Sequence, residues 1–234
     1  MSFKKHIPNA ITSMNLICGS LGVIASFNGR PDIAFILMLS AAAFDYCDGL
    51  SARIMGAYSD VGKELDSLSD DISFGFLPAV MLHNAMVSLG CGIVWSCIPV
   101  VLAVFSALRL AKFNVDPRQH TSFIGVPTPP SAMICGALGC FIYSEPDSIV
   151  TLWCSHCWVL PLLAVVLSFL LVSWIPMFAF KLGKGQKADP ASLKKLRVFI
   201  VAILASILAT LVLGVNWSLA VLLSFIFYIF INLF

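Results

Sequence analysis

The sequence predicts an all-α membrane protein, a bundle of about eight transmembrane helices. Of its 234 residues, 59% are hydrophobic and only 11% are charged, and the mean hydropathy is +0.96. Soluble domains carry about a quarter charged residues, and a soluble chain of this size has no core large enough for so much apolar surface. The composition therefore excludes a soluble enzyme, a nucleic-acid-binding protein and a disordered chain.

Eight apolar runs are long enough for helices that cross the hydrocarbon core, which needs roughly 20 residues. These runs are 11–27, 33–55, 71–89, 91–113, 129–146, 157–180, 196–213 and 215–233. The fifth is the weakest, because Gly136, Gly139 and two cysteines interrupt it. The basic segment Met1–Pro8 lacks a following small-residue cleavage site, so we expect it to be retained on the cytoplasmic side.

Lysines and arginines in the short loops predict the orientation of the bundle. With eight spans and a cytoplasmic N-terminus, 13 of the 14 basic residues lie on the cytoplasmic side, and Arg30 is the exception. A seven-span arrangement loses this bias after the missing helix. We expect cytoplasmic N- and C-termini in an inner membrane. Residues 1–181 would form the transmembrane core, and 182–234 a basic cytoplasmic loop followed by two extra helices.

The cysteines and histidines give no convincing metal or nucleophile motif. Cys154-Ser-His-Cys157 has metal-like spacing, but a structural zinc site needs four ligands and only three candidates are present. A disulfide or two unrelated thiols fit this pair better than zinc. Most of the eight cysteines lie in predicted spans, where a free thiol behaves as a small apolar group.

The acidic residues are concentrated in one segment, with seven of the 12 between Asp45 and Asp71. Asp45 and Asp48 end an apolar run and share one helical face, and Asp66 and Asp70 lie one turn apart on the next helix. Carboxylates at a membrane edge are costly and mark functional sites. We therefore expect four carboxylates to converge near the cytoplasmic surface.

Small residues surround these carboxylates. Gly49 and Ala52 leave space for a ligand, and Gly56 and Gly62 bracket the turn that makes the two helices antiparallel. Four clustered carboxylates repel one another unless cations neutralise them. Oxygen ligands favour Mg²⁺ or Mn²⁺ over Zn²⁺, and two such ions can clamp a phosphoryl group and its leaving oxygen. A solvated or helix-capping role explains the remaining acidic residues of the segment, Asp60, Glu64 and Asp71.

The segment matches the signature D-x2-D-G-x2-A-R-x8-G-x3-D-x3-D and so resembles the CDP-alcohol phosphatidyltransferase family. The resemblance implies six core helices, a homodimer, and transfer from a CDP-linked donor to an acceptor hydroxyl with release of CMP. It implies that the four aspartates bind a pair of divalent metal ions and that Asp70 is the general base. It also implies that four residues frame the cytidine and diphosphate, namely Gly49, Ala52, Arg53 and Gly62.

Three further stretches are similar to the phosphatidylserine synthase branch of that family, namely Pro8 to Gly19, Arg109 to Asn114 and Phe123 to Pro129. The resemblance implies CDP-diacylglycerol and L-serine as substrates. Such synthases commonly have arginine at the position of Lys112. Lysine keeps the positive charge but lacks the planar guanidinium group, which can form two parallel hydrogen bonds.

Serine needs partners for its carboxylate and its ammonium group. The candidates for this acceptor pocket are Arg109, Lys112, Asn114, Ser122 and Thr128. Asn9 and Thr12, at the start of the first helix, are candidates for binding phosphate. The structural alternatives are that the two cations are snorkelling anchors and that Asn9 and Thr12 only begin a helix.

Other functions fit the sequence less well. Glycerol 3-phosphate or inositol 1-phosphate could replace serine in the same chemistry, although a phosphorylated acceptor needs a further cationic pocket. A divalent-cation transporter would carry carboxylates near the bilayer midplane and in both halves of an inverted repeat, whereas this cluster occurs once, at one face. A structural scaffold would not need the cluster.

Overall fold

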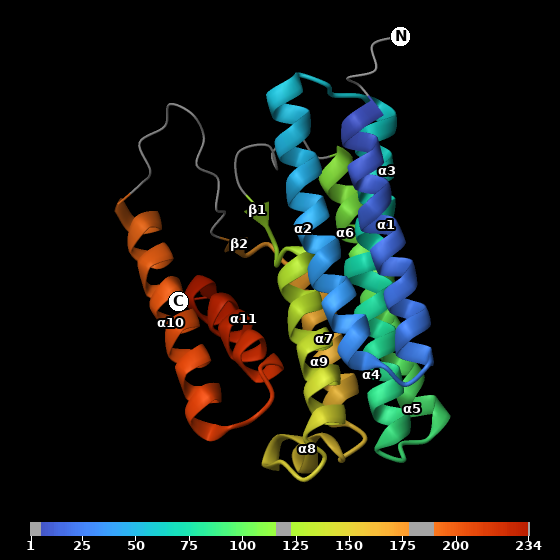
Figure 1. The fold of residues 1–234 in the computed structure, drawn as a ribbon, viewed down its shortest axis with the longest axis vertical. Helices are drawn as coiled ribbons and strands as arrows, with labels where there is room; N and C mark the ends of the chain where they lie inside the picture. The colour runs from blue at the N-terminus through green and yellow to red at the C-terminus, as the bar shows by residue number, and fades with distance from the viewer. Residues whose placement is uncertain (1–5, 116–122, 178–189, 234) are drawn as a thin grey trace.

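The computed structural model describes residues 6–115, 123–177 and 190–233, which are almost entirely helical (Figure 1). The helices are α1 (His6–Phe27), α2 (Pro31–Met55), α3 (Asp60–Asp70), α4 (Leu77–Ser88), α5 (Ile93–Cys97), α6 (Val101–Val115), α7 (Thr128–Ser144), α8 (Ile149–Cys154), α9 (Val159–Leu171), α10 (Pro190–Leu213) and α11 (Ser218–Leu233). A π-helical segment, Asp71–Phe76, joins α3 to α4, and a 3₁₀ segment, Ile98–Val100, joins α5 to α6. The predicted all-α class is confirmed apart from one small sheet.

Four helices of the described chain are long and apolar enough to cross a membrane, and they identify an integral membrane protein. They are His6–Phe27, Pro31–Met55, Ile93–Val115 and Lys194–Leu213. Two shorter apolar helices cover Val159–Leu171 and Ser218–Asn232. The third predicted run belongs to a longer helical path, in which α3, the π-helical segment and α4 follow one another without a break.

Within the described part of the sixth predicted run, residues 157–177, the α-helix covers Val159–Leu171. Beyond this point the chain forms strand β2 (Pro176–Met177), which pairs antiparallel with β1 (Phe123–Ile124). Backbone N–H groups of the β1 segment donate to carbonyls at and beyond the end of α9, Gly125 to Ile175 at 2.9 Å and Val126 to Leu170 at 3.0 Å. Backbone hydrogen bonds therefore join the end of this helix to the β1 segment.

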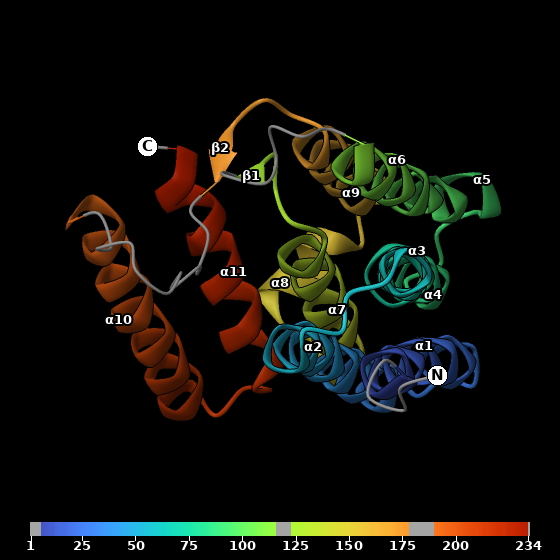
Figure 2. The same ribbon diagram turned by 90° about the horizontal axis from the view of Figure 1, so that it is seen from above.

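Helix α7 lies inside the bundle, between α2, α4 and α11 (Figure 2). Every side chain from residue 131 to residue 142 is buried. A Cβ added at Gly136 would lie 2.0 Å from Cε of Met38, and one at Gly139 would lie 3.3 Å from the carbonyl oxygen of Met81. The glycines that weaken this run in the sequence therefore allow close packing with α2 and α4.

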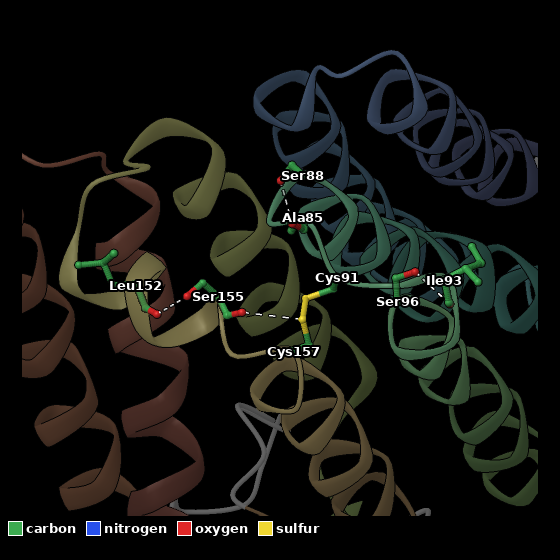
Figure 3. Close-up of a disulfide and its surroundings, with 8 residues drawn as sticks. All are labelled: Ala85, Ser88, Cys91, Ile93, Ser96, Leu152, Ser155 and Cys157. Carbon is green, nitrogen blue, oxygen red and sulfur yellow. Dashed lines mark hydrogen bonds between the residues drawn. A yellow bond between two sulfur atoms is a disulfide. The ribbon is translucent and has the colours of Figure 1, made fainter.

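The end of the bundle that carries the turns before α5 and α9 is crosslinked by a disulfide between Cys91 and Cys157, whose Cα atoms are 5.5 Å apart (Figure 3). Cys154 is free and buried, so Cys154 and Cys157 do not pair with each other. Neither expectation for that motif holds as stated, because Cys157 is in a disulfide whose partner is Cys91 and only Cys154 is a free thiol.

Helices α10 and α11 form a hairpin at one side of the bundle (Figures 1 and 2). The hydroxyls of Ser206 and Ser224 lie 2.8 Å apart across it. At its turn the N–H of Asn216 donates to Glu145 at 3.0 Å, and the ring of Trp217 stacks on Phe35 of α2 at 5.3 Å. The hairpin turn is thus attached to the bundle at the end opposite the start of α1.

Candidate active site

A tight turn makes α2 and α3 antiparallel. Gly56 ends α2 with a left-handed backbone (φ 59°), and its N–H bonds the carbonyl of Ala52. Ser59 begins α3, because its hydroxyl accepts a hydrogen bond from the N–H of Gly62 at 3.0 Å. Glycine adopts positive φ without steric cost, and serine is a preferred N-cap. The local sequence therefore brings the end of α2 beside the start of α3.

Three of the four predicted carboxylates converge across these two helices. One ligand oxygen each from Asp45, Asp48 and Asp66 lies within 4.8 Å of the others. None of the three forms an ion pair with a lysine or arginine of the described chain. Oδ1 of Asp66 is buried without a hydrogen-bond partner in that same part of the chain. An oxygen-only set with uncompensated charge fits a hard divalent cation.

The electrostatics of the cluster agree with this fit. Asp66 lies before the predicted span that begins at residue 71, and burial together with the charge of Asp48 raises its pKa to about 6. Like charges disfavour ionisation, whereas a bound cation favours it. Ionising all the carboxylates of this cluster therefore costs free energy, and a bound divalent ion would offset that cost.

Asp70, the fourth carboxylate, is buried beside the group and held from α1. The amide Nδ2 of Asn15 donates to its Oδ1 at 3.0 Å. Burial and then the charges of Asp45 and Asp66 raise the pKa of Asp70 well above its usual range, while the hydrogen bond from Asn15 opposes the shift. Asp70 is thus close enough to interact with the other carboxylates but has its own hydrogen-bond partner.

The start of α1 covers the cluster. The hydroxyl of Thr12 contacts Oδ2 of Asp48 at 2.5 Å and the carbonyl of Pro8 at 3.0 Å. A Cβ on Gly62 would lie 2.8 Å from Oδ1 of Asn9, so Asn9 lies against the first turn of α3. Thr12 therefore contacts a carboxylate of the cluster, whereas Asn9 lies against the turn that precedes Asp66.

The remaining signature residues border open space. A Cβ on Gly49 would meet no atom within 4 Å of the described chain. Ala52 is half-buried, and Arg53 is exposed at the last turn of α2. The face of α2 that carries Gly49 is therefore unobstructed within the described chain.

Arg109 of α6 is buried, with a relative exposure of 6%, and faces the charge of Asp70. Its Nε has no hydrogen-bond partner among the described residues. A buried guanidinium with an unused donor is costly unless an anion binds it. Among the predicted acceptor residues, Arg109 is the one whose charge interacts with the carboxylate of Asp70.

The other predicted acceptor residues do not gather around Arg109. Nζ of Lys112 lies 5.2 Å from the ring centroid of Trp174, a cation–π contact. Asn114 donates to Ser67 at 2.8 Å and accepts from Lys63. Thr128 is buried at the start of α7, and Ser122 lies outside the described residues.

The sequence prediction missed the roles of Asn15 and Ser73. Asn15 lies three residues after Thr12, on the same face of α1, and Ser73 lies three residues after Asp70. The signal available was the amide of Asn15 inside the apolar part of α1, whose burial needs hydrogen-bond partners.

The sequence is similar to a known protein family and to several curated enzymes. The CDP-alcohol phosphatidyltransferase family matches residues 5–170. A CDP-diacylglycerol–serine O-phosphatidyltransferase of Mycobacterium leprae is 32% identical over 179 residues, which are 73% of this chain and 57% of that protein. One of Bacillus subtilis is 30% identical over 145 residues, 59% of this chain and 77% of that protein.

An archaetidylserine synthase of Methanothermobacter thermautotrophicus is 35% identical over 129 residues, covering 54% of each chain. The chain spans little more than half the length of the mycobacterial relative. The family match covers more than half of the chain, including all eight signature positions and α1. The chain therefore belongs to the CDP-alcohol phosphatidyltransferase family.

Proposed function

We propose that the protein is a phosphatidylserine synthase, which transfers the phosphatidyl group of CDP-diacylglycerol to the hydroxyl of L-serine and releases CMP. The relatives from Mycobacterium leprae and Bacillus subtilis carry the name of this activity. The observation that carries the proposal is the group formed by Asp45, Asp48 and Asp66, an oxygen-only set on two helices that forms no ion pair with a lysine or arginine of the described chain.

We assign the four aspartates as ligands of Mg²⁺ or Mn²⁺, with two ions in the site. When bound, such a pair neutralises the diphosphate and stabilises the departing CMP. The structural support is the unpartnered Oδ1 of Asp66 and the lack of ion pairs in the cluster within the described chain.

Asp70 is the general base in this proposal. One of its oxygens accepts the serine hydroxyl proton, the serine oxygen bonds to the phosphorus that carries diacylglycerol, and the bond from that phosphorus to CMP breaks. A general base must reach the proton it removes. Direct attack needs no protein nucleophile, in agreement with a sequence that shows no Ser–His or Cys–His pair. We expect Asp70→Asn to abolish turnover while CDP-diacylglycerol still binds.

The donor would lie along α2 and the start of α1. Arg53, Asn9 and Thr12 contact the diphosphate, and Gly49 and Ala52 leave room for the cytidine. Gly62 frames the site by letting the start of α3 approach Asn9 of α1. The open space beside Gly49 supports this placement.

Arg109 binds the serine carboxylate in this proposal, because it is buried, faces Asp70 and has an unused donor. Lys112, Asn114, Ser122 and Thr128 are further candidates for the pocket, with Lys112 engaged by Trp174. Arg109→Ala should raise the KM for serine more than the KM for the donor. An unchanged serine KM would remove Arg109 from the pocket.

We further propose that the chain crosses the inner membrane eight times and that both its termini lie in the cytoplasm. We propose also that the protein is a homodimer. Residues 1–181 would be the core, and 182–234 the basic loop with the α10–α11 hairpin. The disulfide supports this topology, because disulfides persist in oxidising compartments and Cys91 and Cys157 lie in turns assigned to the outer side.

The test is CMP release by the purified protein with CDP-diacylglycerol and Mn²⁺. Separate reactions contain L-serine, glycerol 3-phosphate, inositol 1-phosphate or no acceptor. We expect release with serine alone. Release with a different acceptor would keep the metal site and replace the acceptor, whereas no release from folded protein would refute the proposed activity.

A further inference from the structure

We propose that Asn15, held by Ser73, is the positioning residue that fixes the Asp70 carboxylate for proton transfer. The inference rests on the proposed function, in which Asp70 is the base. It adds two residues that lie outside the eight-residue signature, one on α1 and one in the π-helical segment.

The side chain of Asn15 is fully buried, with 0% relative exposure. Its Nδ2 donates to Oδ1 of Asp70 at 3.0 Å, and its Oδ1 accepts from the hydroxyl of Ser73 at 2.7 Å. A buried amide is costly unless both its ends are hydrogen-bonded. The acid and the serine satisfy both ends of this one.

The ionised carboxylate of Asp70 determines which end of the amide faces it, because it can only accept a hydrogen bond. The Ser73 hydroxyl holds the other end of the amide, and it also lies 3.2 Å from the main-chain carbonyl oxygen of Asn15. The amide oxygen therefore turns to the Ser73 hydroxyl, and the NH₂ group turns to Asp70. The reverse orientation would place an amide oxygen against a carboxylate oxygen.

Close packing holds these three residues together. A Cβ on Gly19, one turn after Asn15, would lie 2.2 Å from Oγ of Ser73 and 3.0 Å from its Cα. The close approach of α1 to this segment thus requires a glycine. The wider π-helical turn begins directly after Asp70, and such turns occur frequently at functional sites.

The consequence concerns the orientation of Asp70. The charges of Asp45 and Asp66 act on its carboxylate, and repulsion would turn an untethered side chain away from them. With Oδ1 bonded to Asn15, the plane of the carboxylate is fixed, and with it the direction in which its remaining lone pairs face the acceptor proton and the ion that Asp70 would help to hold. A displacement of about 1 Å in such a group can cost on the order of 100-fold in rate.

The test compares Asn15→Leu with Asn84→Leu by steady-state kinetics of CMP release at saturating Mn²⁺. Asn84 is the matched control, because its amide also bonds α1 to another helix, here α4 through Ser26 at 2.9 Å, but away from the acid. We expect Asn15→Leu to lower kcat 30- to 100-fold with both KM values within threefold of the wild type. Asn84→Leu should lower Tm and leave kcat within twofold.

Ser73→Ala is the second variant and keeps Asn15 in place. It should lower kcat three- to tenfold, and in an Asn15→Leu background it should change kcat less than 1.5-fold, because both act through one amide. If Asn15→Leu does not fold, Ser73→Ala decides alone. An unchanged kcat in either single variant, additive effects in the double variant, or KM values that change as much as kcat would overturn the inference.

The rates are measured with the acceptor that the wild-type protein uses. Failure of the proposed acceptor therefore appears in the wild type, whereas failure of the positioning role appears only between variants. A wild type inactive with every acceptor would refute both.

Discussion

Replacing Cys91 by alanine would open the covalent link between the turn that follows α4 and the turn that precedes α9. Cys91 and Cys157 are 66 residues apart. In the chain-entropy treatment, a crosslink that closes a loop of this length stabilises the folded state by about 4 kcal/mol at 25 °C. Helices in detergent keep much of their order after the bundle comes apart, so this value is an upper bound.

A loss of about 4 kcal/mol corresponds to a fall in Tm of roughly 8–16 °C for a chain of this size. The assay is thermal unfolding of the purified protein in detergent, followed by tryptophan fluorescence with and without dithiothreitol. Cys97→Ala is the control, because Cys97 is a free, exposed thiol nearby in the chain.

Reduction should lower the Tm of the wild type and of Cys97→Ala and should not affect Cys91→Ala. If Cys91→Ala melts within 2 °C of the wild type, or if reduction changes nothing, the crosslink does not stabilise this end of the bundle.

Three more predictions concern the metal site and the β1 segment. Asp66→Asn should weaken Mn²⁺ binding, measured by calorimetry, at least 100-fold, and the exposed Asp60→Asn should leave it within twofold; equal losses would refute the ligand assignment. Because the carboxylates must lose their protons to bind a cation, and burial and neighbouring charge raise the pKa of Asp66 to about 6 and that of Asp70 well above its usual range, Mn²⁺ affinity should rise with pH from 5 upward, and a flat profile would contradict this. Gly125→Ala should cost roughly 2–3 kcal/mol of stability, because its φ is +81° and the new Cβ would lie 2.4 Å from the Leu171 carbonyl oxygen. Gly29→Ala, with positive φ and no neighbouring atom, should cost about 1 kcal/mol, and equal losses would refute the clash.

The helices and the acidic group were predictable because they depend on local patterns. Apolar runs long enough for a membrane determine α1, α2 and α6, and spacings of three and four residues determine which carboxylates share a face. The convergence of Asp45, Asp48 and Asp66 follows from those spacings and from the glycine-containing turn between the helices.

Features that depend on tertiary contacts were not predictable in this way. Cys157 pairs with a thiol 66 residues away instead of its sequence neighbour, since the fold determines which thiols meet. Around the end of helix α9, the carbonyls of Leu170 and Ile175 accept hydrogen bonds from a distant segment, residues 125 and 126. Lys112 contacts Trp174, and Asn15 bonds Asp70 across 55 positions. No periodicity in the sequence reports such pairings.

The most direct test of the central claim is formation of phosphatidylserine by the purified protein as Mn²⁺ is titrated, with CDP-diacylglycerol and L-serine at saturation and the lipid product identified by mass spectrometry. We predict no product without a divalent ion, product that saturates with Mn²⁺ in the wild type, and at least a 100-fold higher Mn²⁺ requirement in Asp66→Asn. Metal-independent phosphatidylserine formation, or the same Mn²⁺ dependence in Asp66→Asn as in the wild type, would contradict the assignment of the carboxylate group as the site of transfer.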